Sequence, residues 1–160
     1  MAMIHDIKIV EMIPKHHQAI LDLAELLSEW FDDKARDRYI TLDLKLHQGY
    51  VALSRDRLLG FVTLTSKTGD GIISWIGVHP DHHRQGIGRR LLETAERHFR
   101  SLGCRRITVE TVGWSDPEYP PYEKTRAFYG GMKYLVSRNL ESGEEAGYRW
   151  QMIEYSKVLG

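Results

Sequence analysis

The stretch that most constrains the fold covers residues 78–103, VHPDHHRQGIGRRLLETAERHFRSLG. It leads from an apolar strand-like run into a basic loop that contains Gly86 and Gly88, and then into an amphipathic helix. Glycines at the start of a helix let an anion approach the backbone N–H groups, and the arginines around them add positive charge. A glycine pair also fits an ordinary helix cap or turn. Here, however, a strand, a turn, a basic loop and a helix follow one another, and that order predicts a phosphate-binding site.

The residues before this stretch show strand and helix patterns in turn. Residues 6–13 alternate and end at Pro14, and the next segment places Ile20, Leu23 and Leu27 on one helical face. Short polar connections between the three strands that follow indicate an antiparallel meander. The expected elements are a strand, two helices and three strands, over residues 6–13, 15–31, 34–47, 50–53, 58–65 and 72–79.

The helix after the glycine pair separates two strands. Gly103 is a natural end for this helix, and Glu96 with Arg100 is expected on its exposed face. Because a crossover helix joins parallel neighbours, the strand over residues 106–112 is expected to run parallel to the strand over 72–79.

The last part of the chain begins with a proline-rich segment, residues 113–121, which is expected to be a surface loop. A short helix over 122–129 follows, and Gly130 and Gly131 are expected to end it. Two closing strands, residues 132–140 and 148–158, are then joined by a polar loop.

Length and composition limit the class of protein. A chain of 160 residues has the size of one domain, and residues 1–160 are expected to form it. Lys plus Arg and Asp plus Glu are both 22, so the formal net charge is zero and a nucleic-acid partner is not expected. The apolar runs are too short to span a bilayer, and residues 1–8 lack a signal peptide's apolar core. A cytoplasmic protein with no membrane partner is predicted, and the single Cys104 is interpreted as a small residue that enters a strand.

The segment VHPDHHRQGIGRRLL, residues 78–92, resembles motif A of the GNAT family of acyl-CoA-dependent N-acyltransferases. In that family a (Gln/Arg)-x-x-Gly-x-(Gly/Ala) loop binds the coenzyme A pyrophosphate, and His83 stands at the leading position here. The order of the expected elements and the run YEKTRAFY extend the resemblance over nearly the whole chain. It implies an α/β (α+β) GNAT fold with a mixed central sheet of about seven strands and about four helices. A splayed parallel pair would form the acyl-CoA cleft.

The resemblance implies acetyl-CoA as the co-substrate, with no metal. The free backbone of residues 76–78 would pair with the pantetheine amides, and the glycine loop would meet the pyrophosphate. The histidines at 79, 82 and 83 lie on one tight turn without a matching cluster elsewhere, so a zinc site is not expected. The expected coenzyme-binding residues are Ile76, Gly77, Val78, His83, Arg84, Gln85, Gly86, Ile87, Gly88, Arg89 and Phe128.

The implied activity is N-acetyl transfer from acetyl-CoA to a primary amine by direct attack. Tyr129 resembles the family's general acid in position, although a core role is the better interpretation without the resemblance. Relatives have three residues between this tyrosine and a Gly–aromatic pair, whereas Gly130 and Gly131 follow it directly here. Glu110 is the first candidate for the general base and His79 the second, and a surface carboxylate or a turn histidine fits each of them as well.

The acceptor stays open between a small-molecule amine and a protein amine. The aromatic residues Trp75, Trp114 and Tyr119 are candidates to line its side of the cleft, and acidic residues at 116, 118 and 123 would suit a cationic amine. The alternative hypothesis is an acyl-CoA-binding regulatory module without turnover. The resemblance also allows a homodimer.

Overall fold

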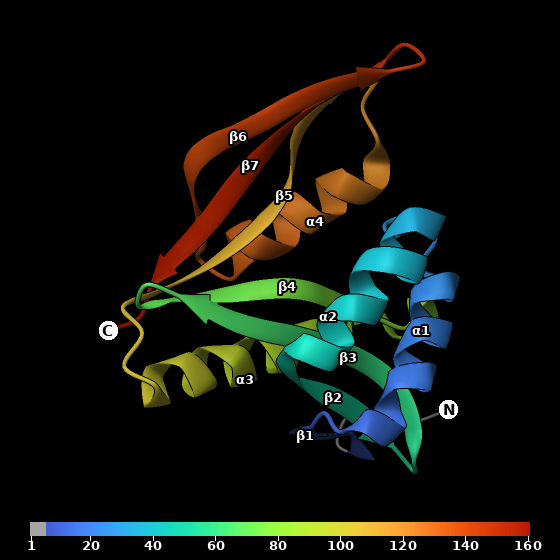
Figure 1. Cartoon of the computed structure of the whole chain (residues 1–160), viewed down its shortest axis with the longest axis vertical. Helices are drawn as coiled ribbons and strands as arrows, with labels where there is room; N and C mark the ends of the chain where they lie inside the picture. The colour runs from blue at the N-terminus through green and yellow to red at the C-terminus, as the bar shows by residue number, and fades with distance from the viewer. Residues whose placement is uncertain (1–5) are drawn as a thin grey trace.

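Seven strands form one mixed sheet in the computed structural model, which describes residues 6–160. The strand order is β1-β2-β3-β4-β5-β7-β6, with β4 and β5 as a parallel pair and antiparallel pairing elsewhere (Figure 1). The strands are β1 (Lys8–Glu11), β2 (Gln48–Ser54), β3 (Arg57–Lys67), β4 (Asp70–Val78), β5 (Arg106–Asp116), β6 (Leu135–Glu145) and β7 (Tyr148–Val158). The α-helices are α1 (His17–Leu26), α2 (Thr41–Leu46), α3 (Ile87–Ser101) and α4 (Pro120–Gly131). The predicted mixed sheet with four helices is confirmed. Within residues 6–160, no helix is both long and apolar enough to cross a membrane.

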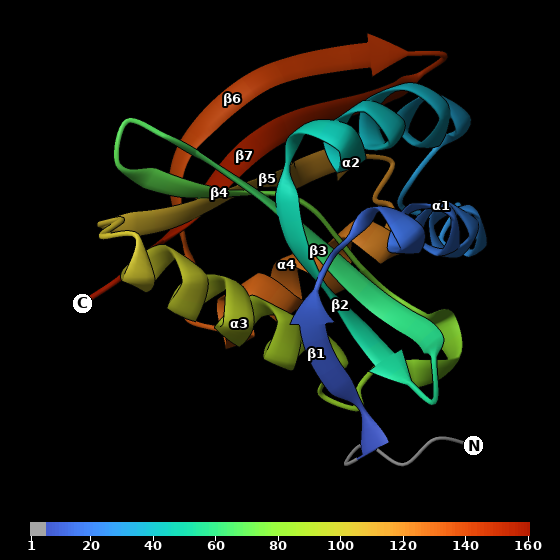
Figure 2. The same ribbon diagram turned by 60° about the horizontal axis from the view of Figure 1, so that its bottom comes forward.

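The helices cover opposite faces of the sheet. Figure 2 shows α3 and α4 on one side and α1 with α2 on the other, and each pair closes its own apolar core. Helix α1 approaches β4 closely, because a Cβ added to Gly77 would lie 2.8 Å from Cδ1 of Leu27 and 2.9 Å from Cε1 of Phe61. A side chain at Gly77 would therefore push α1 off the sheet.

The hairpins are tighter than their sequences suggested. In the β2–β3 hairpin, Arg55 (φ 50°) and Asp56 (φ 68°) both adopt the left-handed conformation, which suits a two-residue turn between twisted strands. The β6–β7 hairpin turns in the same way, at Ala146 (φ 50°) and Gly147 (φ 82°). The predicted polar loop over residues 141–147 is therefore wrong. Most of it is the end of β6, and the hairpin reaches beyond the rest of the sheet.

The parallel pair separates soon after it forms. β4 and β5 pair only from Asp70 with Arg106 to Ile73 with Val109, and beyond these residues the two strands diverge (Figure 1). The second half of β5 continues with β7 and β6 as a three-stranded unit, which we call the arm. The predicted splay of the parallel pair is present, and it leaves one side of β4 without a partner strand.

Several element boundaries differ from the sequence-based prediction: the helix predicted over residues 15–31 is α1, His17–Leu26, and the strand predicted over 132–140 is β6, Leu135–Glu145. The predicted loop over residues 113–121 is wrong at both ends, because β5 runs to Asp116 and α4 begins at Pro120. The second predicted helix, residues 34–47, contains a π-helical segment, Ala35–Ile40, before α2.

Helix α4 continues through Gly130 and Gly131, so the expected early end at Tyr129 is wrong. The helix ends in a Schellman motif, in which the Tyr134 N–H donates to the Tyr129 carbonyl at 3.0 Å and the Lys133 N–H donates to the Gly130 carbonyl at 3.1 Å. Lys133 takes the left-handed position (φ 72°) that glycine usually fills. Three residues therefore separate Tyr129 from a Lys133–Tyr134 pair, which matches the spacing in relatives with lysine in place of glycine.

Glu96 is not on the exposed face of α3, as the sequence pattern suggested. Its side chain is buried, accepts a hydrogen bond from the Tyr134 hydroxyl at 2.9 Å, and lies 3.1 Å from the Lys157 ammonium. Arg100 stands at 3.8 Å on its outer side. This network ties α3 to the end of α4 and to β7, and burial raises the pKa of Tyr134 first, with Glu96 adding to the effect.

The Schellman motif gives a stability prediction. Lys133→Gly should raise the free energy of unfolding by about 1 kcal/mol, because a lysine at positive φ is strained and glycine is not. Urea unfolding would measure it. Lys124→Gly, in the body of α4, is the matched control and should lower stability by about 1 kcal/mol. An equal loss of stability in Lys133→Gly and Lys124→Gly would contradict the Schellman motif.

Candidate active site

Strand β4 presents open backbone groups to the gap that β5 leaves. The His79 N–H donates to the Leu59 carbonyl at 2.8 Å, and this bond sets the alternation of the β3–β4 ladder. In that alternation Ile76 and Val78 turn their N–H and C=O groups away from β3. Both residues lie beyond the part of β4 that pairs with β5. The segment predicted to pair with pantetheine therefore offers both backbone groups of Ile76 and the N–H of Val78, while the Val78 carbonyl oxygen lies 2.7 Å from Nε2 of His83.

The start of α3 lies directly after this segment. Gly86 caps the helix in the left-handed conformation (φ 82°), and no side chain caps the first turn. The first helical hydrogen bond runs from the Arg90 N–H to the Gly86 carbonyl at 3.0 Å, so the N–H groups of the preceding first turn have no helical acceptor. Arg84 also has positive φ (62°) and is exposed beside this turn. An anion placed here would meet backbone N–H groups, the positive end of α3 and arginine side chains.

The loop before α3 is held by its own histidines. His83 Nε2 lies 2.7 Å from the Val78 carbonyl oxygen, and its ring meets Trp30 edge to face at 5.7 Å between centroids. His82 is buried, and its Nδ1 lies 3.2 Å from Oε1 of Gln85. His83 and Gln85 thus shape the loop as well as border it.

Helix α4 packs against the same loop and helix start. A Cβ added to Gly88 would lie 3.3 Å from the Phe128 ring and 3.7 Å from Cγ2 of Val78. Gly88 therefore allows α4 to approach α3, with the Phe128 ring against the start of α3. Ile87 is buried in the core below and serves packing, while Arg89 is exposed and lies 3.9 Å from Glu93.

Tyr129 lies in the last turns of α4 and is 2% exposed. Its ring packs among Phe128, Tyr134 and Tyr155, at centroid distances of 5.3, 5.8 and 5.6 Å. Burial raises the pKa of Tyr129 well above its ordinary value, so the phenol stays protonated throughout the neutral range. It can serve as a proton or hydrogen-bond donor, but not as a base.

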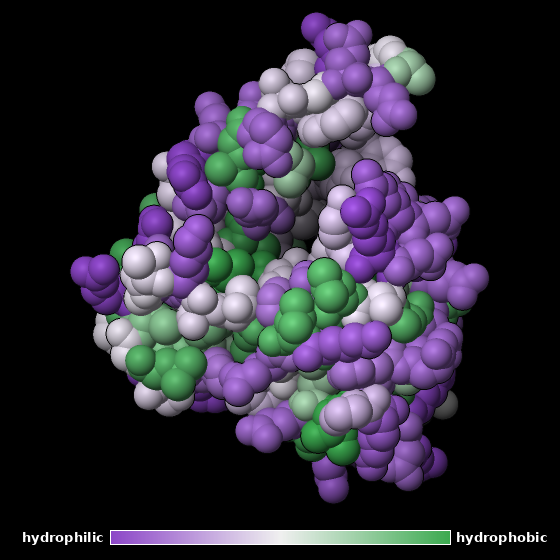
Figure 3. Space-filling model, in the orientation of Figure 1, coloured by the Kyte–Doolittle hydropathy of each residue, from purple (hydrophilic) through white to green (hydrophobic). Residues whose placement is uncertain are grey.

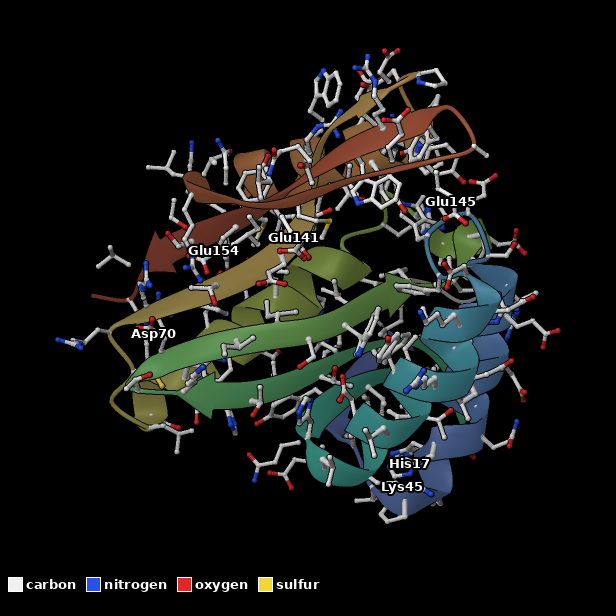
Figure 4. All side chains as sticks on the ribbon, turned by 45° about the horizontal axis from the view of Figure 1, so that its top comes forward. His17, Lys45, Asp70, Glu141, Glu145 and Glu154 are labelled. Atoms are coloured by element: carbon white, nitrogen blue, oxygen red, sulfur yellow. The ribbon has the colours of Figure 1, made fainter. Side chains whose placement is uncertain are left out.

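Glu110 lies on the arm, on the face that turns away from the α3–α4 core. It stands opposite Glu154 in the β5–β7 ladder, and Figure 4 shows Glu154 and Glu141 on the neighbouring hairpin. Burial raises the pKa of Glu110, and the negative charges of Glu141 and Glu154 raise it further. A carboxylate with a raised pKa binds a proton more readily, as a general base must.

His79 points to the other side of β4. Its Nδ1 accepts the Asp81 N–H at 3.2 Å, and its Nε2 lies 3.2 Å from Nη2 of Arg57 on β3. Burial, with Arg57 as the next cause, lowers the pKa of His79. The ring therefore caps the short turn Pro80–His82 from the side opposite β5, and the structure does not bring it together with Glu110.

The surface is hollowed between the arm and the block formed by α1 and α2 (Figure 3). A separate hollow of about 460 Å³ lies on the arm around Trp114, Arg149 and Trp150, away from the glycine loop. Within residues 6–160, no group of three or more His, Cys, Asp or Glu side chains is placed to hold a metal ion.

Of the three aromatic candidates for the acceptor side, the structure places only Tyr119 across the gap, where its hydroxyl donates to the Glu29 carbonyl at 2.8 Å. Trp75 donates from Nε1 to Asp43 at 2.7 Å and packs on Phe31, and Trp114 stacks with Arg149. Two of the three acidic candidates are paired with arginines, Asp116 with Arg149 and Glu118 with Arg126. Glu123 is exposed in the first turn of α4.

Trp30 is a site residue that the sequence did not reveal. It contacts His83 and donates from Nε1 to the Pro121 carbonyl at 3.0 Å, which ties the end of the α1 block to the start of α4. The two partners lie far from Trp30 along the chain, and the residue fits the apolar stripe of the predicted helix over residues 15–31, although α1 ends at Leu26. No local pattern signals such a contact.

The open parallel pair and the uncapped, glycine-started helix occur here within a fold that known acetyltransferases share. The chain belongs to the GNAT family of acetyltransferases, whose family model, described as Acetyltransferase (GNAT) family, matches residues 17–128. It is also similar to an acetyltransferase of Sodalis glossinidius (strain morsitans), with 28% identity over 75 residues, which cover 47% of this chain and 53% of that protein. The match thus spans about half the length of this curated relative.

Solved structures share the fold along nearly the whole chain. A chain from Desulfovibrio desulfuricans assigned to the GNAT family has a TM-score of 0.83 at 20% identity, with 96% of this chain and 99% of that chain covered. An aminoglycoside 6′-N-acetyltransferase complexed with coenzyme A has a TM-score of 0.75 at 18% identity, covering 95% and 97%. The ribosomal-protein-S18-alanine N-acetyltransferase of Escherichia coli has a TM-score of 0.71 at 13% identity, covering 96% and 94%. At these identities the likeness concerns the fold, and it confirms the GNAT architecture.

The raised pKa of Glu110 gives a prediction for stability against pH. A carboxyl whose pKa is higher in the folded state stabilises the fold at low pH, and it loses this contribution as pH rises from the ordinary value through the raised one. Glu110→Gln cannot titrate, so its melting temperature should exceed that of the wild type at pH 7 and approach it under acidic conditions. Thermal unfolding across this range would measure the difference.

The matched control is Glu123→Gln. This carboxylate lies in the first turn of α4, where negative charge is favourable, so its removal should lower stability at pH 7. A wild-type protein that gains stability relative to Glu110→Gln as pH rises would overturn the assignment.

Proposed function

We propose that the protein transfers an acetyl group from acetyl-CoA to a primary amine by direct attack of the amine on the thioester. The observation that carries this proposal is the alignment, within one gap, of open β4 backbone groups with the uncapped start of α3. An acyl carrier with amide groups at one end and a pyrophosphate at the other needs both, in that order along the chain.

The coenzyme side is assigned to the residues from Ile76 to Arg89. The backbone groups of Ile76 and the N–H of Val78 would pair with the pantetheine amides, and the first turn of α3 with Arg84 would hold the pyrophosphate. Bound in this way, the co-substrate supplies an activated acetyl group as a thioester. Phe128 would exclude water from the α4 side of the gap.

The proton steps are assigned to Glu110 and Tyr129. Glu110 would accept a proton from the attacking ammonium or amine, because its raised pKa brings it closer to that of the donor. The new C–N bond forms as the C–S bond breaks, and Tyr129 would donate its proton, or a hydrogen bond, to the departing sulfur. His79 is not needed in this scheme. The acceptor would enter from the hollow between the arm and the α1–α2 block (Figure 3).

Coenzyme binding can be tested by thermal unfolding. Acetyl-CoA at about 100 times its dissociation constant should add about 2.7 kcal/mol to the free energy of unfolding, and Arg84→Ala should reduce this gain at a fixed ligand concentration. Arg97→Ala, an exposed arginine on α3 that contacts Thr94, is the matched control and should leave the gain unchanged. No stabilisation of the wild type at millimolar acetyl-CoA would contradict the assignment.

Turnover can be tested by release of free thiol with a panel of primary amines. Tyr129→Phe and Glu110→Gln should each lower kcat by about 100-fold or more, while acetyl-CoA still raises the melting temperature. Full activity in Tyr129→Phe would exclude the tyrosine as the donor. Stabilisation by acetyl-CoA without thiol release in the presence of any amine would instead favour a coenzyme-binding regulatory module. The deep burial of Tyr129 supports this alternative hypothesis.

A further inference from the structure

Three tyrosines meet at the far end of the hollow, where the β6–β7 hairpin faces the start of α4. The rings of Tyr119 and Tyr122 lie 5.0 Å apart at 60°, and Tyr148 stacks on Trp150 at 5.8 Å and 27°. Burial raises the pKa of Tyr122 first, and Tyr148 and Tyr119 are the next causes, so the three phenols lie within electrostatic reach of one another. We call Tyr119, Tyr122 and Tyr148 the tyrosine cluster.

The Tyr148 hydroxyl is the one buried side-chain polar atom without a hydrogen-bond partner among residues 6–160. Leaving a buried hydroxyl unpaired costs about 1–3 kcal/mol, and native structures rarely keep such groups without a reason. Tyr119 already donates its proton to Glu29, so it does not satisfy Tyr148 by donation. The hydroxyl therefore needs a partner from outside the described chain.

The charge around the cluster is negative. Asp32 contributes to the raised pKa of Tyr122, and Glu29 contributes to that of Tyr119. The arginines of the neighbouring segments are all engaged, because Arg36 is bonded to Asp33, Arg126 to Glu118 and Arg149 to Asp116. The aromatic ring faces themselves attract positive charge.

We propose that the tyrosine cluster binds a second, non-reacting cationic nitrogen of the amine acceptor. The ring faces attract the cation, the Tyr148 oxygen accepts one of its N–H groups, and Asp32 supplies the opposite charge. This inference rests on the proposed acetyl transfer, because it assigns the reacting nitrogen of the same molecule to Glu110. It narrows the acceptor to amines with two or more positive charges.

The arm sets the distance between the two nitrogens. Tyr148, Trp150, Met152 and Glu154 follow one another on a single face of β7, and Glu154 stands opposite Glu110. Six residues of extended strand measure at most about 20 Å, and the curvature of β7 shortens the direct path (Figure 1). Figure 4 shows Glu145, beside Tyr148 in the hairpin, well separated from Glu154. An acceptor that reaches both positions would therefore be an extended molecule of up to about 20 Å, such as a polyamine or a basic peptide.

The experiment compares α,ω-diaminoalkanes with amino alcohols of equal chain length, using thiol release to obtain kcat/KM. The ratio of diamine to amino alcohol should be near one for short chains and rise to about tenfold, equivalent to about 1.4 kcal/mol, once the chain reaches the cluster. A second series of substrates uses peptides with a free N-terminus that carry either lysine or norleucine at successive positions. The substrate series in which the preference appears, diamines or peptides, identifies a polyamine or a peptide as the source of the cation.

Tyr148→Phe and Tyr122→Leu should each bring the tenfold preference close to one, while activity with short amines stays at the wild-type level. Tyr148→Phe should not lower the melting temperature, because it removes an unpaired hydroxyl. Tyr39→Phe is the matched control, since Tyr39 is exposed and contacts Lys34 and Arg38 away from the cluster. It should keep the preference.

The outcomes separate this inference from the proposed function. If thiol is released but the kcat/KM ratio of the doubly charged to the singly charged substrate is near one at every length in both substrate series, the cation site is overturned and acetyl transfer still stands. An unchanged ratio in Tyr148→Phe leads to the same conclusion. If no amine is acetylated, the melting temperature in the presence of long diamines tests whether the cation site exists without turnover. A melting temperature that diamines raise in the wild type but not in Tyr148→Phe supports the cation site without acetyl transfer. If diamines do not raise the melting temperature of the wild type, both the cation site and the proposed acetyl transfer are contradicted.

Discussion

The separation of β4 from β5 is the constraint on which the rest of the structure depends. Parallel neighbours normally continue to share hydrogen bonds, and an unpaired backbone group that water cannot reach costs free energy comparable to a lost hydrogen bond. Here the pairing stops after Ile73 and Val109, although both strands continue for several residues. The open edge of β4 is stable only when water or a ligand occupies the gap. The fold therefore leaves backbone donors and acceptors of β4 open along this gap as part of its topology.

The edges of the gap are held by contacts between segments that are distant in the sequence. Gly88 lets the Phe128 ring come close to α3, and Trp30 links the loop at His83 to the carbonyl of Pro121. These contacts connect the α1 block, the glycine loop and α4, and each involves an aromatic ring. Rings have few rotatable bonds, so they hold the edges at a small cost in side-chain entropy.

The sequence predicted the parts of the fold that depend on local pattern. The period of the apolar residues located the seven strands and the amphipathic α3, and Gly103 ends that helix in the left-handed conformation as expected. The prediction from the sequence failed where a residue takes an unusual role. Glu96 fits an exposed helical pair, but the Tyr134 hydroxyl and the Lys157 ammonium compensate its burial from other elements. Lys133 occupies a position at positive φ that glycine usually fills, so no glycine marked the end of α4.

The same distinction applies to the site. The geometry of the glycine loop was predictable because it depends on adjacent residues, whereas the environments of Glu110 and His79 depend on neighbours from other strands. Glu110 and Glu154 face each other across the β5–β7 ladder, and like charges in this position are unfavourable. Burial would raise the pKa of Glu154, but hydrogen bonds from Ser137 and Arg138 bring it below its ordinary value, while that of Glu110 is raised. One carboxylate of the pair is thus fixed in its charged form and increases the proton affinity of the other. This difference in pKa is what the proposed role of Glu110 as a general base requires.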